Sequence, residues 1–228
     1  MAQLDMVKSK LSPTDGTARD QLEILRKAAK AELSEFFSGF INRLKTPDAF
    51  KEEILPKRIY EHFEEYRVDI EDSSTAAIDG IVRNFFSGSE DQIKSGFINI
   101  IKYAFSTIFG STVSGEQRTS NWFITIEYGA LIRVDVMAWR YNFSSNTVVA
   151  NLKNAFCFTI IKSFVDASTL TSNEIQFFVA KSLGLKTITD IQKDETLKSY
   201  VEYLVKSWST AKSFTVRKFS NVLSKNKK

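Results

Sequence analysis

The feature that most limits the fold of this chain is a long apolar repeat near its N-terminus. Between residues 17 and 44, apolar side chains recur at steps of three and four residues, and Asp15 or Thr17 can cap the first turn. The members of the repeat are Leu22, Leu25, Ala29, Leu33, Phe36, Phe40 and Leu44. This spacing forms one apolar stripe on an α-helix, so it predicts a helix with one buried face.

Few residues elsewhere in the chain interrupt helices. The 228 residues include only 3 Pro and 9 Gly but 19 Phe, a composition that favours long helices packed through aromatic side chains. Further helices are predicted over residues 57–70, 76–86, 92–110, 122–141, 147–165, 172–183 and 196–223, among others. The sequence therefore predicts an all-α fold, a compact multi-helix bundle of about eight or nine helices with a Phe-rich core.

The same patterns predict one main domain. Residues 1–16 are polar, so we expect a flexible leader there. Residues 17–224 form the predicted single all-α domain, and residues 225–228 form a basic tail. The loop-like stretch near residues 110–120 leaves open a boundary between two subdomains. The leader lacks an apolar signal segment, and no stretch reaches the roughly 18–20 uncharged apolar residues of a membrane span, so a cytoplasmic protein is expected.

Residues 122–136 are the most ambiguous part of the chain. Their β-branched residues and partial alternation also suit a hairpin that turns at Tyr128-Gly129, but the helical context favours a helix. On a helix, Glu127 and Asp135 would share one flank, and Arg133 and Arg140 would lie near the opposite one. These four residues are a candidate buried polar network, and their charges would need partners from neighbouring helices.

The pentapeptide SGFIN occurs twice, at residues 38–42 and 95–99. A second repeated peptide, FFSG, recurs at a different spacing, so the two repeats do not describe one duplication. Neither copy of SGFIN has the glycine pattern of a phosphate-binding loop. The repeat is therefore interpreted as a helix–helix packing pattern used twice.

Residue types that carry catalysis are sparse. His62 is the only histidine and Cys157 the only cysteine, and neither has the spacing of a nucleophile with its base. Cys157 lies in an apolar run, where a buried thiol is expected. The acidic residues 69–74 are interpreted as a polar turn. We expect no metal and no cofactor.

The C-terminal helix is the other candidate site. From Thr196 onward the chain has eight Lys and Arg against one Glu, which leaves the first 195 residues at a net charge of −3. The candidate surface-binding residues are Lys206, Trp208, Lys212, Arg217, Lys218 and Phe219. A basic amphipathic helix can lie on an anionic membrane or bind a partner, but its apolar stripe can also pack on the core. One basic segment is not a basic groove, so nucleic acid is not an expected partner.

The segment RVDVMAWRYNFSSNTVVANLKNAFCFTIIKSFVDAS, at residues 133–168, resembles a group of uncharacterised proteins from filamentous fungi. In that group an aromatic W-x-Y-N-F segment precedes a long apolar helix. The resemblance implies a helical protein and a fungal source. It implies no activity and assigns no site residues.

Taken together, these patterns favour a non-catalytic helical protein that acts by self-association, as a homo-oligomer, or by binding another protein. The alternative is a protein that binds a membrane surface or a lipophilic ligand, through the basic C-terminal helix or an apolar interior. A third reading is an enzyme whose buried polar site is formed by Glu127, Arg133, Asp135 and Arg140.

Overall fold

A long, twisted antiparallel β-sheet organises the part of the protein that the computed structural model describes. Described are residues 18–46, 50, 53–69, 115–142, 154–166, 170–182, 193, 195 and 198–210. The elements are α2 (Ala18–Leu44), β1 (Pro56–Asp69), β2 (Gly115–Glu127), β3 (Ala130–Asn142), β4 (Asn154–Val165) and α5 (Ser172–Ser182), followed by a helix over residues 198–210.

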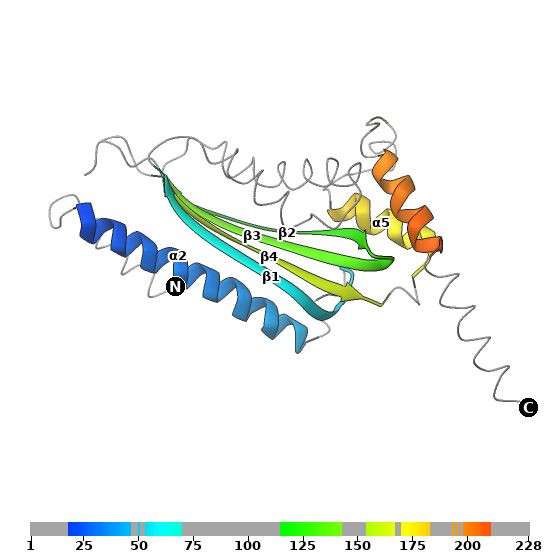
Figure 1. Cartoon of the computed structure of the whole chain (residues 1–228), viewed down its shortest axis with the longest axis horizontal. Helices are drawn as coiled ribbons and strands as arrows, with labels where there is room; N and C mark the ends of the chain where they lie inside the picture. Colours follow the sequence, from blue (N-terminus) through cyan, green and yellow to red (C-terminus); the bar gives the residue numbers. More distant parts are fainter. Residues whose placement is uncertain are drawn as a thin grey trace, which may run out of the picture.

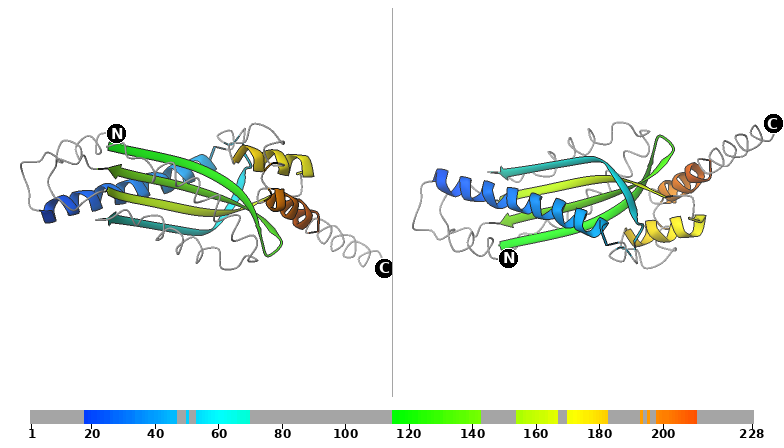
Figure 2. Two further views of the ribbon diagram at one scale, coloured as in Figure 1. Left: turned by 90° about the horizontal axis from the view of Figure 1, so that it is seen from above. Right: turned by 90° about the horizontal axis from the view of Figure 1, so that it is seen from below.

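The four strands pair in the order β1-β4-β3-β2, and all three pairings are antiparallel. The strands β4 and β3 are therefore central, and β1 and β2 flank them. Helix α2 runs along one face of the sheet (Figure 1). Helix α5 and the helix over residues 198–210 lie together near the end of the sheet where the β2–β3 hairpin turns (Figure 2).

The all-α prediction is wrong. Three stretches predicted as helices, residues 57–70, 122–141 and 147–165, contain strand in their described parts, and β2 begins within the stretch near residues 110–120 that was predicted as a loop. The central strand β4 is buried on both faces, so its apolar residues form a continuous run whose period does not distinguish a strand from a buried helix. In β3, the side chains of Ile132, Val134 and Val136 alternate with those on the other face, as β-branched residues of a strand do.

A two-residue turn joins β2 to β3. Glu127 pairs with Ala130, and the intervening Tyr128 and Gly129 have φ angles of 50° and 77°. Positive φ at both central residues is the type I′ geometry, whose twist matches that of the flanking strands. The hairpin that the sequence offered as an alternative is therefore the structure, and the boundary considered near residues 110–120 falls at the start of β2.

The helices with a clear apolar repeat are confirmed. Helix α2 matches the predicted residues 17–44, α5 matches residues 172–183, and residues 198–210 are helical as expected. Helix α5 begins with a capping box, in which the Glu174 backbone N–H donates to the Thr171 hydroxyl and the Thr171 N–H donates to the Glu174 carboxylate. Predictions for residues 1–16, 76–86, 92–110 and 211–228 lie outside the described residues.

The two faces of the sheet build separate parts of the core. On one face, α2 packs its buried residues against the odd-numbered residues of β3 and β4; these are Leu25, Ala28, Ala29, Leu33 and Phe40 against Met137, Trp139, Ala155, Cys157 and Ile161. On the other face, a larger cluster includes Phe156, Phe158 and Ile160 of β4. Residues Tyr200, Val201, Leu204 and Trp208 of the last described helix join that larger cluster.

The first copy of SGFIN lies within α2, where its Phe40 packs against Met137 and Ile161 of the sheet. The predicted helix–helix contact is therefore wrong for this copy, because the partner is a sheet. The glycine of the copy, Gly39, has open space around its Cα. The second copy, at residues 95–99, lies outside the described residues.

Candidate functional site

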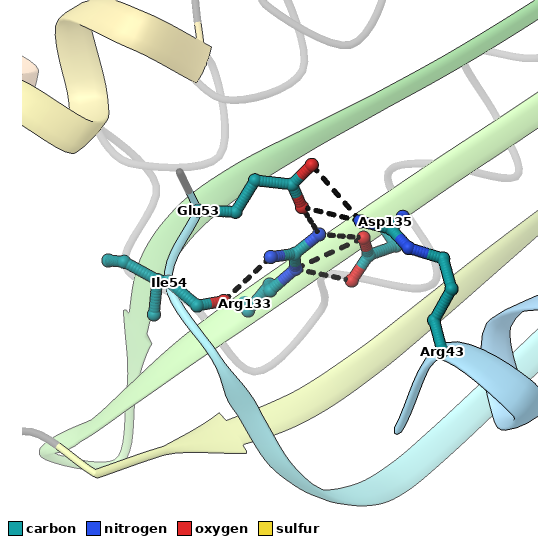
Figure 3. Close-up of polar contacts among 5 residues, drawn as sticks. All are labelled: Arg43, Glu53, Ile54, Arg133 and Asp135. Atoms are coloured by element: carbon teal, nitrogen blue, oxygen red, sulfur yellow. Dashed lines mark hydrogen bonds and ion pairs between the residues drawn. The ribbon is translucent and has the colours of Figure 1, made fainter. Parts of the chain in front are cut away.

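The fully buried guanidinium of Arg133 is the centre of a polar cluster. It projects from the central strand β3 toward the face that α2 covers. Its Nε and Nη2 donate to the Asp135 carboxylate at 2.6–3.1 Å, its Nη1 donates to the carbonyl of Ile54 at 2.6 Å, and its Nη2 donates to Glu53 at 2.6 Å (Figure 3). These contacts join β3 to the segment that precedes β1.

Arg43, near the end of α2, completes this cluster. Its Nη2 contacts both carboxylate oxygens of Glu53, at 3.1 and 3.2 Å. The ring of Phe50 lies under both guanidinium groups, with 4.4 Å between its centroid and the Arg43 Cζ and 5.0 Å to that of Arg133. We call Arg43, Glu53, Arg133 and Asp135 the Arg133 cluster.

The Arg133 cluster combines two guanidinium groups with two carboxylates. Burial raises the pKa of Asp135, against the opposing effect of Arg133. Burial lowers the pKa of Arg133, but the carboxylates of Asp135 and Glu53 outweigh it and hold the pKa above its ordinary value. The guanidinium therefore stays charged, with Asp135 of β3 and Glu53 and Ile54 before β1 as its partners, and Glu53 links it to Arg43 of α2. Such a cluster fixes the relative positions of α2, the segment before β1 and the sheet.

The four residues of the predicted polar network are all buried, but they lie in three places. Arg133 and Asp135 contact each other, because residues two apart on a strand share a face. Glu127 lies on the opposite face, where its carboxylate accepts from the Tyr60 hydroxyl and lies 2.9 Å from the Lys162 Nζ. Arg140 lies toward the other end of β3, opposite Gln117.

Lys162 is the buried cation that the sequence analysis did not identify. It lies on the central strand β4, 2.9 Å from both Glu61 and Glu127, with its Nζ 5.9 Å from the centre of the Tyr60 ring. A lysine that is buried on a central strand needs a carboxylate partner. The sequence signal that could have identified Lys162 is its position within an apolar run.

A third charged group lies between α2 and β2. The Glu32 side chain has no exposed surface, and one of its carboxylate oxygens accepts from Arg118. Arg118 also contacts Glu35 at 3.4 Å and Glu116 at 3.1 Å. We call Glu32, Glu35, Glu116 and Arg118 the Glu32 cluster. Burial raises the pKa of Glu32 to about 7, against the opposing effect of Arg118.

His62 and Thr159 form the pair of described residues that most resembles a nucleophile with its base. The His62 Nε2 lies 2.9 Å from the Thr159 hydroxyl, and Glu64 approaches the same nitrogen at 3.7 Å. However, the Thr159 hydroxyl donates to the carbonyl of Phe63, so the Nε2 is the donor in the His62 contact. A carboxylate that orients a catalytic histidine contacts the other ring nitrogen. The pair therefore holds β1 against β4 and does not activate a nucleophile.

Cys157 is equally unsuited to nucleophilic chemistry. Its side chain is fully buried under α2, in contact with the apolar cluster that includes Leu25 and Trp139. Burial raises the pKa of the thiol well above its ordinary value. The sequence expectation of a buried thiol at this position is confirmed.

The tip of the β2–β3 hairpin carries the most exposed large side chain of the described residues. Tyr128 is 90% exposed, and it occupies the left-handed region of backbone space. Tyr60, at 38% exposed, lies near it: burial and the hydrogen bond to Glu127 raise the pKa of Tyr60, and Tyr128 adds to that rise.

The predicted surface-binding helix is described only in part. Lys206 is exposed, whereas Trp208 is buried in the core cluster. Lys212, Arg217, Lys218 and Phe219 lie outside the described residues. The described portion therefore packs its apolar stripe on the core.

Within the described ranges, no three His, Cys, Asp or Glu side chains are arranged to hold a metal ion. None of the helices described here is both long enough and apolar enough to cross a membrane. Comparison with protein-family models, with curated proteins and with solved structures finds no match to this chain.

Proposed function

We propose that this protein acts without catalysis, by associating with another protein through the tip of the β2–β3 hairpin. The observation that carries the proposal is the backbone of Tyr128. A bulky residue at φ 50° costs on the order of 1–2 kcal/mol relative to the ordinary region, and Asn or Gly is the usual residue of a type I′ turn. Because the side chain is 90% exposed, no packing within the described fold offsets this cost.

A strained, exposed aromatic residue is typical of a binding position. Tyrosine is among the residues that most often dominate the energy of a protein interface, because it combines a large contact area with few rotatable bonds. The neighbouring Tyr60 widens the aromatic surface, and its hydroxyl is fixed by Glu127. The charged groups of the described fold support a scaffold role, since Arg133 pairs with Asp135 on one face of the sheet and Lys162 pairs with Glu127 on the other.

The first partner to test is a second copy of the chain. In a two-fold contact the same residues face each other, so Tyr60 and Tyr128 of both copies would meet in one aromatic cluster. We further propose that such an assembly forms in the cytoplasm. The resemblance to fungal proteins remains a prediction of the sequence alone.

Sedimentation velocity over a wide range of protein concentration tests the proposal. We expect the mean sedimentation coefficient of the wild-type protein to rise with concentration, and Tyr128→Asn to weaken association ~10-fold or more. Asn tolerates positive φ, so this variant should fold at least as stably as the wild type. The matched control is Phe177→Asn, which removes a 57% exposed aromatic residue from α5. A Tyr128→Asn protein that associates like the wild type would contradict the role of the hairpin tip.

The alternative proposal is binding to a membrane surface. In the described part of the terminal helix, Lys206 is exposed but Trp208 faces the core. An aromatic anchor for a membrane surface would therefore have to come from another part of the described fold, such as the exposed Tyr128 of the β2–β3 hairpin. Sedimentation with anionic vesicles separates the two proposals. Pelleting that needs vesicles and weakens at high salt would favour the membrane surface.

A further inference from the structure

The Glu32 cluster places three carboxylates around one guanidinium beneath α2. Glu32 projects from the buried face of α2, and Arg118 and Glu116 lie on β2. One Glu32 oxygen accepts from Arg118, and the other is buried without a hydrogen-bond partner among the described atoms. Burying a carboxylate oxygen without a hydrogen-bond donor costs much free energy when the carboxylate is ionised. The cost is much smaller when the group is protonated and neutral.

Among the described residues, Arg118 is the one cation that pairs with Glu32. Glu35 lies one turn along α2, Glu116 also accepts from the Trp139 indole of β3, and Arg118 is shared among all three carboxylates. On β4 the nearest titratable group is Cys157, whose thiol pKa is raised first by burial and then by Glu32. On β1, Tyr66 packs in the same apolar cluster, and Glu64 adds another negative charge near Cys157.

We propose that a proton held at Glu32 is part of what keeps α2 on the sheet, so that α2 separates more readily as the pH rises toward neutrality. The physical basis is that separation moves Glu32 into water, where its carboxylate ionises freely. In the closed form, burial raises the pKa of Glu32 to about 7, with Glu35 and Glu116 adding to the rise. A group whose pKa is higher in the closed form stabilises that form at low pH, and this contribution is lost as the pH rises toward 7.

Labelling of the Cys157 thiol measures the separation of α2 from the sheet. Cys157 is the only cysteine in the chain, and it is fully buried against Leu25, Ala28, Ala29 and Leu33 of α2. A thiol reagent can reach it only when α2 moves away or the protein unfolds. The labelling rate, divided by that of the urea-unfolded protein at the same pH, measures the opening equilibrium and cancels the pH dependence of the thiol itself.

The experiment compares the wild type with Glu32→Gln, which mimics the protonated acid, and with the matched control Glu35→Gln on the exposed side of the cluster. With a pKa of about 7 closed and 4.5 open, the normalised labelling rate of the wild type relative to Glu32→Gln should rise about 70-fold between about pH 5 and about pH 8. Glu35→Gln should retain most of that rise. A ratio that stays constant over this range would overturn the proposal.

His62 titrates at the same interface with the opposite sign, because burial lowers its pKa and its ring stacks on Phe37 of α2. Dividing the wild-type labelling rate by the Glu32→Gln rate at each pH removes the contribution of His62. If Glu32→Gln does not fold, His62→Asn in an otherwise wild-type chain provides the second test. In that protein the normalised labelling rate must rise with pH, and a flat or falling rate would overturn the proposal.

Discussion

Replacing Arg133 with methionine tests the buried ion pair at the centre of the Arg133 cluster. Methionine fills much of the volume of the arginine stem but donates no hydrogen bond. It would leave the Asp135 carboxylate and the Ile54 carbonyl without the donors that they now have at 2.6–3.1 Å. Asp135 is only 4% exposed, so water cannot replace the lost guanidinium.

The expected loss follows from the cost of a broken buried ion pair. Removing one partner of such a pair destabilises a protein by about 3–5 kcal/mol, because the other charge stays buried and unpaired. This is a large part of the roughly 5–15 kcal/mol that stabilises a typical domain. Adding Asp135→Asn to Arg133→Met removes the orphaned charge, so the double variant should recover about 2 kcal/mol or more.

Urea unfolding followed by circular dichroism measures these differences as shifts of the midpoint at an unchanged m value. The control is Arg58→Met, which removes an exposed arginine whose Cζ lies 5.1 Å from the centre of the Phe164 ring and should cost less than about 1 kcal/mol. The buried ion pair would be contradicted by a cost of Arg133→Met no greater than that of this control, or by a double variant less stable than the single one.

Three further substitutions test separate parts of the fold, each measured by urea unfolding. Gly39→Ala should raise stability by about 0.5–1 kcal/mol, because the site has open space within helix α2; a loss would show that the backbone there is not freely helical. Gly129→Ala should lower stability by about 1–2 kcal/mol, since φ there is 77°; no loss would contradict the type I′ turn. Phe158→Ala should cost about 3–5 kcal/mol, because Phe158 is fully buried on a central strand; a loss below 1 kcal/mol, about a third of the low estimate, would contradict its place in the core.

The helices could be predicted wherever one face of the helix meets water. In α2, buried residues such as Leu25, Ala29 and Leu33 alternate with exposed charged ones at helical spacing, so the sequence carries the period directly. Helix α5 carries its own start signal, because Thr171 and Glu174 cap each other. In both cases the local sequence and the tertiary environment favour the same structure.

The strands could not be predicted in the same way, because their patterns are set by partners far along the chain. In β1 the apolar residues Ile59, Phe63 and Tyr66 are spaced as on a helix, but on the strand Phe63 packs on one face of the sheet and Ile59 and Tyr66 pack on the other. In β4 both faces are covered, which removes the alternation that marks a half-exposed strand. Low glycine and proline content then favoured helices, although long strands also need few of these residues.

In the β3 segment, the spacing of the charged residues distinguishes a strand from a helix, whereas the spacing of the apolar residues does not. On a helix, Arg133 and Asp135 would project about 200° apart, so each would need a separate buried partner. On a strand they lie on one face about 7 Å apart along the backbone, where they can pair with each other. The strand therefore needs fewer additional partners for the same two buried charges. In the structure, the Arg133 guanidinium makes a bidentate contact with the Asp135 carboxylate. The register of the hairpin then assigns Glu127 to the opposite face, where it meets Lys162. An opposite-charge pair two residues apart within an apolar run therefore favours a buried strand over a buried helix.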